Sequence, residues 1–125
     1  MKNARFYLLC ASVSLFIAIG CGAFGAHALK KMLSSEMLAI WQTAVQYQFV
    51  HGLALLGLAG ISQYEDSLGL RRIAYWMLAG MLIFCGSLYA LALSNIRILG
   101  AITPLGGLAF LVAWGLLTWR VWRNQ

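Results

Sequence analysis

The sequence predicts an all-α integral membrane protein, a bundle of four antiparallel transmembrane helices. Of its 125 residues, 62% are apolar or aromatic and 10% are charged, and the mean hydropathy is +0.83. A soluble domain averages about half apolar and about a quarter charged residues, so this composition excludes an ordinary soluble protein. The apolar residues also gather in four runs, each long enough for the ~20 residues that a spanning helix needs.

The four runs give the expected spans in chain order. We expect them at Phe6 to Ala26, about Thr43 to Ile61, Ile73 to Leu93 and Ile98 to Trp119. The second run leaves open an earlier start near Glu36, as an interfacial helix. The period-two alternation of a barrel strand is absent. Short connections make consecutive helices antiparallel, and with no repeat or linker we expect residues 1–125 to form a single domain.

The net charge of +6 comes from cations at the ends of the apolar runs. This is the pattern of topology signals rather than of a nucleic-acid-binding face, so we expect no nucleic-acid partner. With a cytoplasmic amino terminus, the inner side holds Lys2, Arg5, Arg71, Arg72, Arg120 and Arg123, and the outer side holds Lys30, Lys31 and Arg97. Since Lys and Arg favour the cytoplasmic side, both termini are expected there. Aromatic residues typical of the lipid interface lie near the span ends, namely Trp41, Tyr64, Tyr75, Trp119 and Trp122.

The cysteines give no sign of a disulfide framework. Cys10, Cys21 and Cys85 are odd in number and lie inside apolar runs, so we interpret them as small membrane-buried residues. The stretch AIGC at residues 18–21 loosely resembles the lipobox of a lipoprotein signal. The chain stays apolar after Cys21, however, so we expect the first run to remain as a helix.

Small residues recur at every fourth position of the first run. Cys10, Ser14, Ala18, Gly22 and Ala26 would lie on one stripe of a helix. Such stripes let helix backbones approach closely in lipid. We therefore predict a helix-packing face formed by Ser14, Ala18, Gly22 and Ala26; the alternative is that glycine and alanine are simply common in membrane helices.

Polar residues within the runs predict a pocket in the outer half of the bundle. Thr43, Tyr47 and His51 follow one another at i, i+4 and i+8, so a polar face enters the membrane on the second run. At that depth polar groups should face protein or a water-filled cavity. The segments 86–89 and 100–107 bring further polar groups into the same leaflet. The predicted pocket consists of His27, at its mouth, with Gln48, His51, Ser87, Tyr89 and Thr103. The histidine at the mouth has a second interpretation, as a hydrated interfacial residue.

Four motifs resemble the domain-of-unknown-function 423 family. They are GAFGAHALK at 22–30, WQTAVQYQFVHGLALL at 41–56, GSLYALAL at 86–93 and GAITPLGGLAFLVAW at 100–114. Their order and spacing cover nearly the whole chain, and the eukaryotic transmembrane protein 256 looks related. The resemblance implies a small multi-pass protein of the bacterial inner membrane, and it implies no particular activity.

Three classes of function remain at this stage. The first, which we favour, is a non-enzymatic structural or accessory membrane protein whose polar cluster fixes helix packing. The alternative is a small transporter or channel, although Glu36, Glu65 and Asp66 all lie outside the expected spans and only the histidines remain for proton coupling. The partners are then the lipid bilayer and, as an open question, a second copy or another membrane protein.

The third and least favoured class is a haem- or quinone-linked redox protein. A bis-histidine haem needs ligands at similar depth, whereas His27 and His51 differ by about 10 Å along the bundle. A metal site built from His51, Cys21 and Cys85 lacks a recognised ligand spacing. Because the sequence also shows no catalytic constellation and no phosphate-binding or dinucleotide-binding motif, we expect no catalytic residue, metal or cofactor.

Overall fold

The computed structural model describes residues 2–65 and 69–124 and confirms the predicted helical membrane fold. Within these ranges four helical stretches are long and apolar enough to span a membrane: Asn3–Met32, Ser35–Ile61, Leu70–Ser94 and Arg97–Arg123. Every one extends beyond its predicted bounds. The largest difference is in the second stretch, which starts at Ser35 instead of Thr43, so the earlier start that the sequence left open is the observed one.

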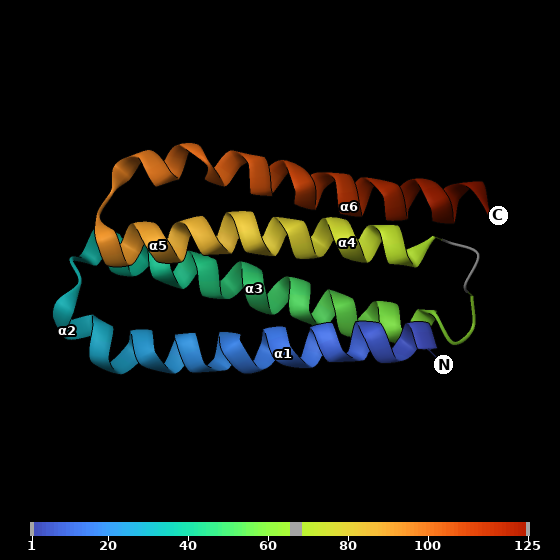
Figure 1. Cartoon of the computed structure of the whole chain (residues 1–125), viewed down its shortest axis with the longest axis horizontal. Helices are drawn as coiled ribbons and strands as arrows, with labels where there is room; N and C mark the ends of the chain where they lie inside the picture. Colours follow the sequence, from blue (N-terminus) through green and yellow to red (C-terminus); the bar gives the residue numbers. More distant parts are fainter. Residues whose placement is uncertain (1, 66–68, 125) are drawn as a thin grey trace.

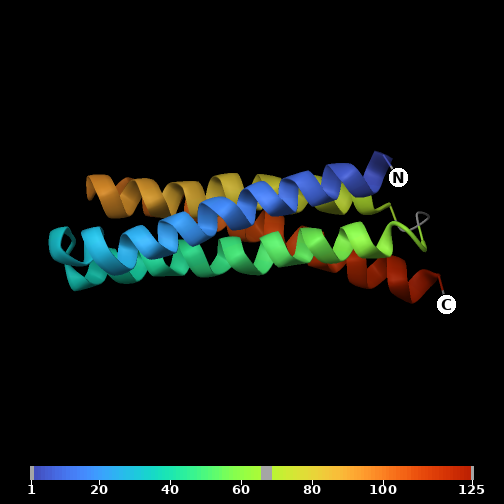
Figure 2. The same ribbon diagram turned by 90° about the horizontal axis from the view of Figure 1, so that it is seen from below.

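The helices form two antiparallel hairpins packed side by side (Figure 1). The first hairpin contains α1 (Lys2–Phe24), the π-helical η1 (Gly25–Leu29), α2 (Lys30–Met32) and α3 (Ser35–Ile61). The second contains α4 (Leu70–Gly80), the π-helical η2 (Met81–Cys85), α5 (Gly86–Ser94), the 3-10 helix η3 (Arg97–Ala101) and α6 (Thr103–Arg123). Within the hairpins α1 packs on α3 and α6 packs on α4 and η2, while α3 joins the two hairpins through α5 and η2. Figures 1 and 2 both show the two chain ends at the same end of the bundle.

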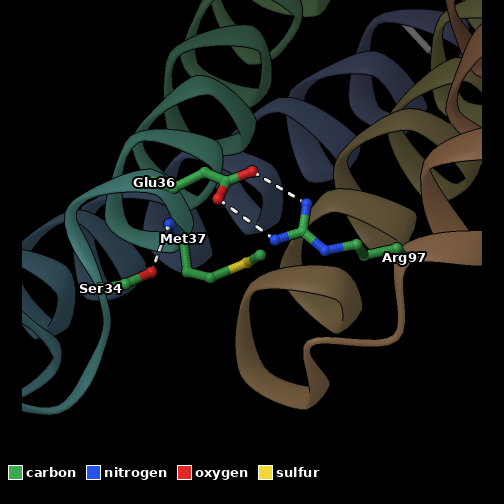
Figure 3. A network of polar contacts seen from close by, with 4 residues as sticks. All are labelled: Ser34, Glu36, Met37 and Arg97. Carbon is green, nitrogen blue, oxygen red and sulfur yellow. Dashed lines mark hydrogen bonds and ion pairs between the residues drawn. The ribbon is translucent and has the colours of Figure 1, made fainter.

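At the other end of the bundle a polar network connects the two hairpins (Figure 3). Ser34 caps α3, since its hydroxyl accepts a 3.2 Å hydrogen bond from the Met37 N–H. Arg97, at the start of η3, donates to both carboxylate oxygens of Glu36 at 3.0 and 3.2 Å. Both partners are exposed, so the pair adds little stability, but its bidentate geometry fixes the start of α3 against that of η3.

The face that α1 turns toward α3 repeats every seven residues. Ala4, Ala11, Ala18 and Gly25 are all buried. The predicted four-residue repeat does not stay on one face, because four residues overshoot a full turn by about 40°, whereas seven fall short of two turns by about 20°. Among the predicted packing residues Ala18 is fully buried, but Ala26 is exposed.

Two other predicted packing residues lie close to α3. A Cβ placed on Gly22 would lie 3.4 Å from the Val45 side chain. A Cβ placed on Gly52 of α3 would lie 3.6 Å from the Ser14 Cβ. Gly22 and Ser14 are both partly buried. These two residues extend the close contact between α1 and α3 beyond the seven-residue repeat.

The tightest helix contact lies in the second hairpin, between η2 and α6. A Cβ placed on Gly106 would come 2.3 Å from the Phe84 backbone nitrogen, and one placed on Gly80 would come 2.4 Å from the Phe110 ring. Glycine at these two positions therefore permits α6 to lie directly against the π-helical turn. Phe84 and Phe110 fill the space on either side, with ring centroids 5.5 Å apart.

Candidate functional site

Three polar residues are buried among the side chains that the structure describes: Gln48, His51 and Ser87. Each contacts a different partner on a neighbouring helix. Unsatisfied polar groups in hydrocarbon cost several kcal/mol, so the first question is where their hydrogen bonds go.

His51 is held between a backbone carbonyl and a tryptophan. Its Nδ1 lies 2.8 Å from the Tyr47 carbonyl oxygen, and its Nε2 accepts a 3.1 Å hydrogen bond from the Trp114 indole N–H of α6. The indole nitrogen only donates and the carbonyl only accepts, so these contacts require a neutral imidazole with its proton on Nδ1. The ring also stacks on Phe110, with centroids 3.7 Å apart and planes 12° apart.

His51 lies farther from the start of its helix than the sequence predicted. The distance from Ser35 to His51 is about 24 Å of helix at 1.5 Å per residue, in a helix about 40 Å long. That His51 lies in the outer half of the bundle stays a prediction. Gln48 lies near the middle of α3, whereas Ser87 and Tyr89 are in α5 and Thr103 begins α6, toward the end of the bundle opposite the two termini (Figure 1).

Gln48 links three helices. Its amide nitrogen donates to the Ser14 carbonyl of α1 at 2.9 Å, and its amide oxygen accepts a 2.7 Å hydrogen bond from the Tyr89 hydroxyl of α5. Tyr89 in turn lies against Trp41, with ring centroids 4.6 Å apart. The side chain therefore uses both ends of its amide to join α1 and α5 to α3.

Trp41 explains the small residues at the end of the first run. Its indole N–H donates to the Cys21 carbonyl oxygen at 2.8 Å. The ring lies so close to Gly25 that a Cβ there would be 2.6 Å from the Trp41 Cδ1. Any side chain larger than glycine at this position would displace the indole that bonds α3 to α1.

The third group joins α5 to α6. The Ser87 and Thr103 hydroxyls lie 2.7 Å apart, Ser87 also donates to the Phe84 carbonyl at 3.0 Å, and the Thr103 hydroxyl lies 3.4 Å from the Leu99 carbonyl oxygen. Each hydroxyl has one proton to donate, so the two hydroxyls can form only two of these three hydrogen bonds at a time, and this is the weakest of the three groups.

The predicted pocket residues thus fall into three hydrogen-bonded groups: Gln48 with Tyr89, Ser87 with Thr103, and His51 with Trp114. His27 is exposed in η1. Gln48 and Tyr89 line a cavity of about 300 Å³ together with Ser14. His51 and Trp114 line another, of about 380 Å³. That all six predicted residues enclose one pocket stays a prediction.

Sequence reasoning missed two tryptophans that bond to the interior. Trp114 lies within the fourth run, five residues before its end, and Trp41 was assigned to the lipid interface. An indole N–H in the middle of a span needs a hydrogen-bond acceptor, so the position of Trp114 was the available signal. Over residues 2–65 and 69–124, no three His, Cys, Asp or Glu residues come together in a way that could hold a metal ion.

Comparisons with known proteins agree on one family. The model of the family described as protein of unknown function (DUF423) matches residues 21–107. A UPF0382 membrane protein of Staphylococcus saprophyticus is 42% identical over 113 residues, which cover 90% of this chain and 93% of the relative. The UPF0382 inner membrane protein YgdD of Escherichia coli K12 is 41% identical over 115 residues, covering 92% and 88%. The UPF0382 membrane protein YwdK of Bacillus subtilis is 40% identical over 111 residues, covering 88% and 90%. No solved structure matches the chain.

Proposed function

We propose that this chain, which belongs to the DUF423 family and is a membrane protein, acts as a non-catalytic accessory protein whose interior polar residues fix the packing of four helices. One observation carries the proposal. The buried polar side chains that the structure describes form their hydrogen bonds with a neighbouring helix or with backbone carbonyls of their own helical stretch; these side chains are Gln48, His51 and Ser87.

This use of hydrogen bonds favours packing over transport. A transport site needs donors, acceptors or charges that a substrate can engage and then leave. Gln48 uses both ends of its amide, and His51 uses both ring nitrogens. A substrate would therefore have to break existing interhelical bonds before it could form its own.

The outer face of the first hairpin supports an accessory role. Only 17% of the most apolar window of the Asn3–Met32 stretch is buried within the chain, compared with 44% for Ser35–Ile61. Large apolar residues on that stretch, such as Phe16, Ile19 and Met32, are exposed. We propose that this face contacts lipid and either a membrane-protein partner or a second copy of the chain. We also propose that residues 1–125 form a single domain.

The orientation is also part of the proposal. Arg5, Arg71, Arg72, Arg120 and Arg123 all belong to segments at the end of the bundle where both termini lie, whereas Lys30, Lys31 and Arg97 belong to the opposite end (Figure 1). Since Lys and Arg concentrate on the cytoplasmic side, we place both termini in the cytoplasm and the chain in the bacterial inner membrane.

A matched pair of variants tests the packing role. Gln48→Leu removes both interhelical hydrogen bonds, whereas Gln46→Leu makes the same change at an exposed position two residues away. We expect Gln48→Leu to lower the free energy of unfolding in detergent by about 1 kcal/mol, the usual size of such bonds in membranes, and Gln46→Leu to leave it unchanged.

A flux assay tests the same proposal against transport. The purified protein is reconstituted in liposomes that enclose a pH-sensitive dye, and a pH gradient is imposed with a potassium-valinomycin potential. We expect the same proton flux as in empty liposomes. A protein-dependent flux that His51→Gln abolishes would overturn the accessory role, as would equal stability of the two glutamine variants.

A further inference from the structure

A second polar feature lies at the opposite end of the bundle from Glu36 and Arg97. A cavity of about 390 Å³ opens between the start of α4 and the end of α6, and it is lined by Gly69, Arg71, Arg72, Tyr75 and Arg120. Three of these five residues carry a positive charge. None of the hydrogen bonds of the interior groups reaches this cavity, so the packing of those groups does not account for it.

Arg71 is fixed in place and shapes one wall. Its guanidinium lies 4.0 Å from the centre of the Phe6 ring, and its Nη2 donates to the Asn3 side-chain oxygen at 3.1 Å. These contacts tie α4 to α1. They also use part of its hydrogen-bonding capacity, so Arg71 contributes mainly its charge and its stem to the cavity.

Arg120 is held against the turn that begins α4. Gly69 has a left-handed backbone, with φ of 66°, and a Cβ there would lie 3.7 Å from the Arg120 Cζ. The guanidinium also lies 5.6 Å from the Trp119 ring centre. The Arg120 guanidinium thus lies beside Gly69 and the indole at the edge of the cavity, with its N–H groups left for another partner.

The cavity lacks a neutralising charge in the part of the chain that the structure describes. Neither Arg72 nor Arg120 forms an ion pair or a hydrogen bond with any described residue, and no acidic side chain lines the cavity. Two guanidiniums, each a planar fork of donors, match the oxygens of a phosphate group. The start of α4 adds to this field, because Gly69 supplies no side-chain cap for its first N–H groups.

We propose that this cavity binds the phosphate of an anionic phospholipid headgroup, with Arg72 and Arg120 as its direct contacts. The position favours a lipid over free phosphate. The cavity lies where two spanning helices end. Tyr75 lines it, and Trp119 and Trp122 are exposed on the last turns of α6, as aromatic residues at a lipid interface are. A basic pocket between transmembrane helices at this level holds a headgroup while the acyl chains follow the apolar helix faces.

Native mass spectrometry of the full chain tests this site. The protein is delipidated in detergent and titrated with dioleoyl phosphatidylglycerol, with dioleoyl phosphatidylcholine and, in competition, with inorganic phosphate. The test variant is Arg72→Gln/Arg120→Gln. The control, Lys30→Gln/Lys31→Gln, removes the same charge at the other end of the bundle.

We expect wild type and the control to bind phosphatidylglycerol in preference to phosphatidylcholine. The test variant should bind phosphatidylglycerol about 30-fold more weakly, since each basic residue near an anionic lipid surface raises the affinity about fivefold. If the double variant does not fold, Arg72→Gln alone, at an exposed position, should still show a loss of about fivefold. Equal weakening in the test and control variants, or equal binding of the two lipids, overturns the site. Displacement of phosphatidylglycerol by equimolar phosphate overturns its assignment to a lipid.

Discussion

The close approach of α6 to η2 predicts that Gly106→Ala destabilises the bundle. A Cβ at this position would lie 2.3 Å from the Phe84 nitrogen, 2.6 Å from its Cβ and 2.7 Å from its Cα. Carbon atoms pack at about 3.5 Å or more, so the two helices would have to separate by about 1 Å. Backbone atoms cannot move away as the end of a side chain can, and the whole contact between α6 and the π-helical turn must shift.

The size of the effect follows from two opposing contributions. Overpacking a well-packed site costs about 1–3 kcal/mol, and a clash with backbone belongs at the upper end of that range. Replacing glycine by alanine inside a helix returns up to about 1 kcal/mol through helix propensity. The expected net loss for Gly106→Ala is therefore about 2 kcal/mol.

The neighbouring glycine supplies a control with the same chemistry. At Gly107 the nearest atoms of Phe84 would be 3.9 Å from the new Cβ, an ordinary contact. Gly107→Ala should therefore be neutral or slightly stabilising. Unfolding of both variants by sodium dodecyl sulfate in mixed micelles, followed by circular dichroism, measures the difference. If Gly106→Ala proved as stable as Gly107→Ala, the close packing of α6 on η2 would be refuted.

Three further predictions test other contacts. Trp114→Phe keeps an aromatic ring but removes the donor to His51, so it should lower the free energy of unfolding by about 1 kcal/mol in the same assay. Trp122→Phe, at an exposed position, should leave the free energy of unfolding unchanged. Equal losses in the two variants would show that the hydrogen bond does not stabilise the bundle. Ala18→Leu places a large side chain on a fully buried position of α1 and should lower the free energy of unfolding by about 1–3 kcal/mol. Ile17→Leu, on an exposed neighbour, should leave it unchanged. Thermal melts that coincide for the two variants would contradict the packing face. Reporter fusions after Gln125 and after Glu65 should report the cytoplasm and a fusion after Ser34 the outside, and a periplasmic signal from Gln125 would reverse the proposed orientation.

The number of spans was predictable from the sequence, but their ends were not. Apolar composition measures how much helix lies in hydrocarbon, whereas a helix continues into the interface as long as its backbone is hydrogen-bonded. The first turns of α3 carry the polar residues Glu36, Gln42 and Thr43, so the hydropathy of the sequence placed the start of this span too far along the chain. The cap at Ser34 was the local signal for the true start, since its hydroxyl is followed by an acidic residue in the first turn.

Gln48, His51 and Ser87 are buried, as expected of polar residues within the spans, but their hydrogen-bond partners could not be predicted. Gln48 and His51 lie three positions apart on α3 and were assigned to one pocket, yet Gln48 bonds to α1 and α5 whereas His51 bonds to α6. The reason is that α3 packs on α1 of its own hairpin and on α5 and η2 of the other hairpin, so neighbouring faces of it meet different partners. Spacing within one helix gives the angle between two side chains, about 60° here, and carries no information on which helix lies opposite each.

The contacts of His51 also bear on proton coupling, the one route to transport that the sequence left open. An imidazolium donates from both nitrogens and accepts from neither, so a proton arriving at Nε2 would face the Trp114 N–H at the 3.1 Å distance that now holds a hydrogen bond. Two opposed donors at that distance repel, so Trp114 would have to turn away. Phe110 limits rotation of the imidazole itself, because the two rings stack with centroids 3.7 Å apart. Charging His51 thus requires the hydrogen bond between His51 and Trp114 to break first, which favours a role of the neutral ring in helix packing.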